Sequence, residues 1–326
     1  MANGRFFFVL SGFVIALNYL DKIFTFKDII LFQKKRFLRL YPLHFIMLII
    51  FLFIEITKYI AEAKFGLNAN NKAFTINNLV SFLANIFLIQ NYTVSNLTFN
   101  TPSWSISAEF YTYFLFALIF FFNRGRKKII TTILLLNIIG CGYLLNKYGM
   151  STANGPLRCL YAFSFGVLIF ILYTKIKNKY KFSSSFPSAL TIIITILIIT
   201  KMGGGVDPNN YKYSELTILL FGGVILSLVL TKSTSSIYLF LSKKYLVYMG
   251  TISYGIYMVH AAVWWLINQF LRFVVKVDTK IQDTSEIIIV INNPILLSVI
   301  AFLGMTIIIL LSHFSYKSIE KKFYFK

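Results

Sequence analysis

The sequence predicts an all-α integral membrane protein, folded as a polytopic helical bundle. Three observations lead to this prediction: 57% of the 326 residues are hydrophobic, 13% are charged, and the mean hydropathy is +0.73. Soluble domains carry roughly 25% charged residues. Because one membrane span needs about 20 apolar residues, a chain of this length has room for about nine or ten spans.

Nine apolar runs are long enough to be spans. They fall near residues 6–20, 40–60, 104–122, 129–146, 158–174, 188–201, 214–231, 248–272 and 294–313. A tenth run, Leu79 to Gln90, is shorter and is flanked by asparagines. Irregular backbone at membrane depth is tolerated only where protein covers it. We therefore expect about nine spans and one re-entrant or interfacial segment.

The basic residues predict the topology. A net charge of +21 would suggest nucleic-acid binding in a soluble protein, but here the charges lie in short runs between apolar segments. Five segments hold 21 of the 32 Lys and Arg residues, namely 21–39, 123–128, 175–186, 232–245 and 314–326. Basic loops stay cytoplasmic, so we expect the amino terminus outside and the carboxyl terminus in the cytoplasm. We found no internal repeat or interdomain linker, so residues 1–326 are predicted to form a single membrane domain.

A cationic cluster precedes the second apolar run. It contains Lys35, Arg36 and Arg39, and the two arginines would share one face of a helix at i, i+3 spacing. Guanidinium groups at the cytoplasmic edge of a membrane suit phosphate groups, such as those of a nucleotide thioester. Anchoring to anionic lipid headgroups is the alternative, and composition alone favours it.

Glu109 is taken to be the only acid well inside an apolar run, and Ser105 lies on the same helical face at i, i+4 spacing. A membrane helix keeps a buried carboxylate only when that group has a partner or lines a wet cavity. A functional role for Glu109 and a structural hydrogen bond to a neighbouring helix both remain open.

His260 lies near the middle of the run 248–272, where Ser253, Tyr257 and Trp264 share its helical face. A polar stripe inside a span is a candidate site, although a lone buried His is more often a packing partner than a base.

Three other features are less specific. Ser11 and Gly12 lie midway along the first run, where a Ser-Gly pair permits close approach of a backbone or a ligand. His44 lies at the cytoplasmic end of a predicted span, so we interpret it as solvated at the interface. The two cysteines have no metal-site spacing, and no metal is expected.

Taken together, these segments resemble the acyltransferase-3 family of integral membrane acyltransferases, which includes bacterial O-antigen and other surface-glycan O-acetyltransferases. The similarity covers almost the whole chain in five ordered parts. Phe7 to Ile15 is similar to the family's F-F-V-L-S-G-F-x-I helix, Lys35 to Pro42 to K-R-x-x-R-x-Y-P, Pro102 to Glu109 to P-S-W-S-x-S-x-E, Ile252 to His260 to I-S-Y-x-I-Y-x-x-H, and Ser315 to Phe323 to S-Y-x-x-I-E-x-x-F.

The resemblance implies acyl transfer in the bacterial plasma membrane. A cytoplasmic acyl-CoA, usually acetyl-CoA, would donate its acyl group to a hydroxyl of a glycan or lipid-linked sugar outside. Arg36 and Arg39, with Lys35, would contact the CoA phosphates. Ser11, Glu109 and His260 would line a membrane-embedded cavity, with Glu109 orienting a base or the acceptor hydroxyl. Membrane lipid would surround the protein, and nucleic acid is not an expected partner.

The chain departs from the family at its start. The resemblance implies a preceding helix with an Arg and, ten residues later, a His regarded as the catalytic base, and this sequence lacks that helix. An amino terminus outside, with no preceding span, points to the same gap. O-acyl transfer needs a base that draws the proton from the attacking hydroxyl. We expect a true start further upstream; otherwise His260 would have to substitute, or the protein would be inactive.

A function of another class also fits these residues. In a transporter or flippase of a lipid-linked sugar, Glu109 and His260 would serve as substrate or proton-relay groups. Binding of acyl-CoA would distinguish the two, because a flippase has no need of it.

Overall fold

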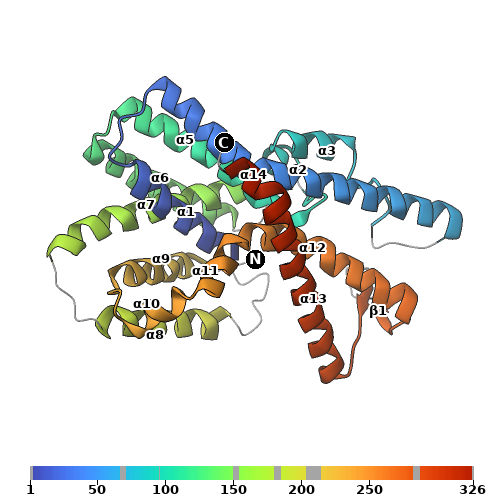
Figure 1. Cartoon of the computed structure of the whole chain (residues 1–326). Helices are drawn as coiled ribbons and strands as arrows, with labels where there is room; N and C mark the ends of the chain where they lie inside the picture. The colour runs from blue at the N-terminus through green and yellow to red at the C-terminus, as the bar shows by residue number, and fades with distance from the viewer. Residues whose placement is uncertain are drawn as a thin grey trace. The chain divides into compact units, whose positions relative to one another are not determined.

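The computed structural model describes residues 3–66, 71–94, 96–149, 154–179, 185–202, 214–281 and 287–324. Almost all of them are helical (Figure 1). The first elements are α1 (Asn3–Tyr19), α2 (Phe26–Phe65), α3 (Leu79–Ile86), α4 (Gln90–Thr93), the 3-10 turn η1 (Thr101–Ser103), α5 (Trp104–Asn123), α6 (Lys127–Tyr148), α7 (Gly155–Lys179), α8 (Ser185–Met202) and α9 (Ser214–Leu230). They are followed by α10 (Ser236–Leu241), α11 (Lys244–Thr251), α12 (Ser253–Gln269), the π-helical turn η3 (Phe270–Val275), β1 (Thr279–Ile281), β2 (Ile287–Ile289), α13 (Pro294–Ser315), the π-helical turn η4 (Tyr316–Glu320) and α14 (Lys321–Tyr324).

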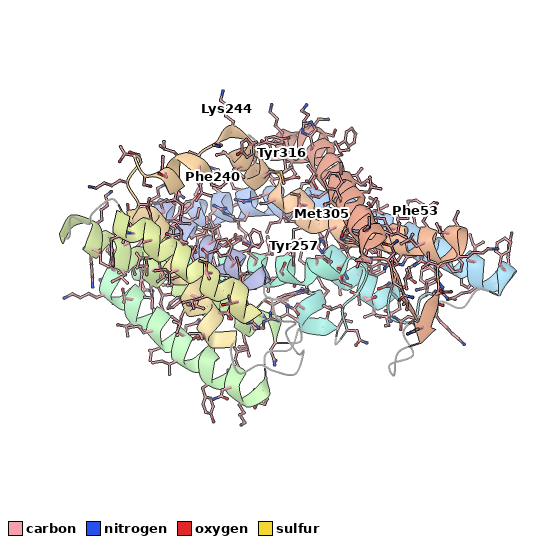
Figure 2. All side chains as sticks on the ribbon, turned by 90° about the horizontal axis from the view of Figure 1, so that it is seen from below. Phe53, Phe240, Lys244, Tyr257, Met305 and Tyr316 are labelled. Atoms are coloured by element: carbon pink, nitrogen blue, oxygen red, sulfur yellow. The ribbon has the colours of Figure 1, made fainter. Side chains whose placement is uncertain are left out.

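The all-α membrane class is confirmed. Within the described residues, six helices are long and apolar enough to cross a membrane, and three apolar helices are shorter, near Gly4–Tyr19, Phe186–Thr200 and Leu216–Leu230. Together they cover the nine predicted spans. Many of their large apolar side chains are exposed, such as Phe53 on α2 and Met305 on α13 (Figure 2). Such a surface suits hydrocarbon rather than water.

Helix α2 corrects the prediction that residues 21–39 form a loop. It starts at Phe26 and is 40 residues long, or about 60 Å at the usual rise per residue. The Thr25 hydroxyl caps the Asp28 amide at 3.3 Å, and the Asp28 carboxylate accepts from the Thr25 amide at 2.8 Å. This reciprocal pair starts the helix early, as in a capping box, so the cationic cluster is helical.

The short tenth run does not form one spanning helix. Asn78 caps α3 by accepting the Ser81 amide at 3.0 Å, and the helix ends at Ile86. Leu88 then has a φ of 57°, in the left-handed region. Eight residues of helix reach about 12 Å, well short of the roughly 30 Å hydrocarbon layer. The re-entrant or interfacial placement of this segment stays a prediction.

The chain forms two compact units. The first contains Met1–Lys34 and Ala108–Val247, and the second contains Lys35–Ser107 and Tyr248–Lys326. Each is described below by itself.

The first unit is organised around close packing of α1 on α7 (Figure 1). A Cβ on Gly12 would lie 2.1 Å from the Phe163 carbonyl oxygen, and one on Gly166 would lie 2.0 Å from the Val9 carbonyl oxygen. Only glycine permits this approach, which is the small-residue packing of membrane helices. Helices α8 and α9 pack on each other in the same unit, joined by a 2.8 Å hydrogen bond between the Thr191 and Ser227 hydroxyls.

The second unit contains α12 packed against α13 (Figure 1). A Cβ on Gly304 of α13 would lie 2.6 Å from the Trp264 ring of α12, so glycine makes room for the indole. Between the two helices, β1 and β2 form an antiparallel hairpin in which Lys280 pairs with Ile288.

Candidate active site

Three side chains of the first unit form a polar cluster inside apolar helices. The Ser11 hydroxyl of α1 donates to Oε1 of Glu109 on α5 at 2.6 Å. The Tyr113 hydroxyl, one turn further along α5, hydrogen-bonds to the same oxygen and lies 3.2 Å from Ser11 Oγ. Glu109 and Ser11 are half-buried. The carboxylate therefore has the partners that a membrane helix requires.

Packing fixes the geometry of this cluster. The Tyr113 ring makes edge-on contacts with Phe32 and Phe163, with centroids 6.1 and 5.8 Å away. The same Phe163 contributes the carbonyl that Gly12 approaches. The backbone beside Ser11 and the ring of Tyr113 are thus both held by α7. A hydroxyl held in this way loses little further entropy when it binds a carboxylate.

A buried arginine lies at the start of α7 in the same unit. Arg158, at the start of α7, is 1% exposed. The next residue, Cys159, accepts a hydrogen bond of 3.3 Å from Thr112 of α5. Sequence reasoning missed Arg158, although it opens the apolar run 158–174.

The second unit holds a separate set of polar contacts on α12. The Tyr257 hydroxyl donates to the Pro102 carbonyl at 2.8 Å and lies 2.9 Å from the Ser105 hydroxyl. Tyr257 is labelled on α12 in Figure 2. Ser105 and Glu109 have different partners, although helical spacing places them on one face. Ser105 thus helps to hold α12 against the turn before α5.

His260 has a defined tautomer in its neutral form. Its Nδ1 lies 2.7 Å from the Tyr257 carbonyl oxygen, which can only accept a hydrogen bond. The ring hydrogen is therefore on Nδ1, and the lone pair of a neutral ring is on Nε2. The side chain is half-buried. This is the arrangement that a general base needs.

The predicted cations lie on the part of α2 that belongs to the second unit. Arg36 is half-buried, while Lys35 and Arg39 are exposed. Just beyond them, the Leu40 carbonyl accepts a 2.5 Å hydrogen bond from the Tyr254 hydroxyl of α12. This bond ties the cationic turn of α2 to the start of α12.

The statement that Glu109 is the only acid well inside an apolar run is wrong. Glu55 on α2 is 4% exposed. Its carboxylate accepts from the Asn77 side chain at 2.7 Å, the Phe74 amide at 3.1 Å and the Lys58 amine at 2.9 Å. These bonds hold residues 74–77 onto α2, which is a structural role. Sequence reasoning missed Glu55 because it lies near the end of the apolar run 40–60.

The interpretation of His44 as solvated is also wrong. The side chain is 1% exposed, and its Nε2 donates to the Asn85 carbonyl oxygen at 2.9 Å. The Asn85 amide in turn donates to the Thr98 hydroxyl at 2.8 Å. His44 is therefore a packing residue that joins α2 to α3. Its place at the end of a predicted span suggested contact with solvent, but α3 covers this face of α2.

The fold and these polar sites define a polytopic helical membrane protein with ionisable groups inside its apolar helices. The family model described as acyltransferase domain, that of the acyltransferase-3 family, matches residues 5–313. The chain belongs to this family and is a membrane acyltransferase by class. Comparison with curated proteins and with solved structures gives no match.

Proposed function

We propose that this protein is an O-acyltransferase of the bacterial plasma membrane, with its amino terminus outside and its carboxyl terminus in the cytoplasm. It transfers an acetyl group from cytoplasmic acetyl-CoA to a hydroxyl of a cell-surface glycan, such as O-antigen or another polysaccharide. The observation that carries the proposal is the Glu109 carboxylate, held at 2.6 Å by Ser11 inside apolar helices. Family membership supports the reaction class.

The reaction needs a base and a means of orienting the acceptor. The acceptor hydroxyl oxygen attacks the thioester carbonyl carbon, the C–S bond breaks, and CoA leaves as a thiolate that takes up a proton. His260 suits the base, because the bond from Nδ1 to the Tyr257 carbonyl leaves the lone pair on Nε2. Ser11 and Tyr113 both bond to Oε1 of Glu109. A carboxylate has lone pairs on two oxygens, so Glu109 can also accept from a sugar hydroxyl.

The donor contacts are assigned to Arg36, Arg39 and Lys35. CoA carries a pyrophosphate and a ribose phosphate, and the planar fork of a guanidinium binds phosphate oxygens in pairs. Arg36 and Arg39 lie one turn apart on α2, where residues 26–65 form one continuous helix. A helix presents the two groups on one face at a spacing suited to a polyanion.

The test is the binding of acetyl-CoA to the detergent-purified protein. Replacing Arg36 and Arg39 together with Ala is expected to weaken binding by about tenfold or more, because two charge-assisted contacts are lost. Arg126→Ala with Lys128→Ala is the matched control. It removes the same charge from exposed positions that are also predicted to be cytoplasmic, and it should leave affinity unchanged.

The results separate the alternatives. Equal affinity in the Arg36 and Arg39 double variant and the wild type would overturn the assignment of the donor site. A protein that does not bind acetyl-CoA but moves a lipid-linked sugar across liposome membranes would be the transporter alternative. Equal loss in the matched control would mean that net charge, rather than these two arginines, attracts CoA.

A further inference from the structure

A buried amide joins the turn before α5 to the helix that carries His260. Asn100, directly before η1, is 1% exposed, and its Nδ2 donates to the Met258 carbonyl oxygen of α12 at 3.0 Å. The two residues are 158 positions apart, and both belong to the second unit. The turn η1 also packs on α12. The amide therefore holds a backbone group of α12 against this turn.

Packing alone does not account for this amide. Its Oδ1 is buried, and no donor in the described part of the chain bonds to it. An unpaired buried acceptor costs free energy, so an apolar side chain of similar shape would fit here at lower cost. The Met258 carbonyl lies inside α12, where a helix supplies it with a partner four residues further on. It does not need Asn100 for a hydrogen bond, so what the amide adds is a fixed position for this turn of α12.

The carbonyl that Asn100 holds is next to the one that orients His260. His260 Nδ1 lies 2.7 Å from the Tyr257 carbonyl oxygen, and Met258 follows Tyr257 in the chain. Of two successive peptide units in α12, one is thus bonded to Asn100 and the other to the imidazole. A rotation of α12 by about 10° would move a group roughly 6 Å from its axis by about 1 Å. The bond from Asn100 opposes such a rotation.

The Tyr257 hydroxyl holds the same turn less directly. It donates to the Pro102 carbonyl of η1 at 2.8 Å, and Figure 2 labels its side chain on α12. This hydroxyl lies at the far end of a long side chain, whereas Asn100 bonds to the backbone of α12 itself. Asn100 is therefore the contact that fixes the backbone beside His260.

We propose that Asn100 is a positioning residue, which places the His260 imidazole for its role as the base by holding the Met258 carbonyl. A general base must lie within hydrogen-bond reach of the hydroxyl whose proton it takes. A displacement of about 1 Å can lower the rate by about 100-fold. The inference rests on the proposed function, because it needs His260 to act as the base. It gives the turn before α5 a role in the transfer step.

The test is Asn100→Leu, which keeps the approximate size of the side chain but removes the amide. In transfer from radiolabelled acetyl-CoA to membrane glycan, kcat should fall by roughly 10- to 100-fold. KM for acetyl-CoA should stay unchanged, because the groups assigned to the donor lie on α2. Asn123→Leu is the matched control and should keep the kcat of the wild type. Its amide donates to the Ile119 carbonyl at 2.7 Å, a bond within α5 alone.

A double-mutant cycle separates positioning from structure. In a His260→Gln background, Asn100→Leu should cause no further loss of kcat, because the group that it places is absent. Additive losses would overturn the proposal. A fall in kcat that only matches a loss of folded protein, measured by unfolding in detergent, would also overturn it. Asn100→Ala removes the same donor without adding bulk, and the same results are expected of it if the leucine variant does not fold.

The cycle also distinguishes this inference from the function on which it rests. If His260→Gln lowers kcat and Asn100→Leu does not, the positioning role fails and the assignment of the base stands. If His260→Gln leaves kcat unchanged, the assignment of the base itself fails, and the inference fails with it.

Discussion

The Ser11 hydroxyl donates to Glu109 Oε1 at 2.6 Å, although 98 positions separate the two residues. One belongs to the Ser-Gly pair of the first apolar helix and the other to the carboxylate of α5. Two sequence features that each carried little weight alone are therefore parts of one cluster. Tyr113 bonds to the same oxygen and completes it.

Glu109→Gln is expected to reduce acetyl transfer by at least ~100-fold, the contribution typical of a group that assists proton transfer or orients the reacting hydroxyl. The charge is lost while the shape and an acceptor for Ser11 remain. Transfer from radiolabelled acetyl-CoA to membrane glycan, released by mild base, measures the effect. Glu62→Gln is the control, because Glu62 accepts only from the Ala73 amide in the described part of the chain. Unchanged surface acetylation in Glu109→Gln would favour an inactive family member.

His260→Gln is expected to lower kcat by about 10²- to 10⁴-fold, since glutamine cannot accept a proton at near-neutral pH. Tyr257→Phe is the informative comparison. It removes the hydroxyl that bonds to Pro102 and Ser105 but keeps the backbone carbonyl that orients His260. The phenylalanine variant should retain most of its kcat. If both variants lost activity equally, His260 would be a packing residue.

Gly12→Ala is expected to lower the free energy of unfolding by about 1–3 kcal/mol, the usual cost of overpacking. The new methyl group would meet the Phe163 carbonyl oxygen at 2.1 Å, and backbone cannot yield as a side chain can. Gly140→Ala in α6 is the control, because no atom lies within 4 Å of a Cβ there and alanine favours helix. Unfolding of both variants in detergent by added denaturant measures the difference. Equal stability of the two would contradict the close packing of α1 on α7.

The membrane class and the positions of the spans could be predicted from the chemistry of the backbone. In hydrocarbon, the backbone N–H and C=O groups of a span find hydrogen-bond partners only within their own helix. A run of apolar residues long enough to cross is then a helix whatever surrounds it. The cationic cluster and the isolated carboxylate Glu109 were visible for the same reason, since each departs from the apolar background.

Boundaries and neighbours were not predictable in this way. Counting basic residues placed 21–39 in a loop. The rule that basic loops stay cytoplasmic concerns charge, however, and does not predict backbone conformation. The reciprocal hydrogen bonds between Thr25 and Asp28 start α2 at Phe26. His44 was assigned to solvent by its place along the chain, yet α3 covers it.

The sequence by itself determined that this protein lies in a membrane, that it is helical and to which family it belongs. Only the tertiary structure decided that Ser11 reaches Glu109 and that Glu320 lies against Gly255. The physical reason is that helical periodicity states which side chains share a face but not which distant helix that face meets. Which helix packs on which depends on where glycines permit close approach, and this is a property of pairs of helices rather than of one helix alone.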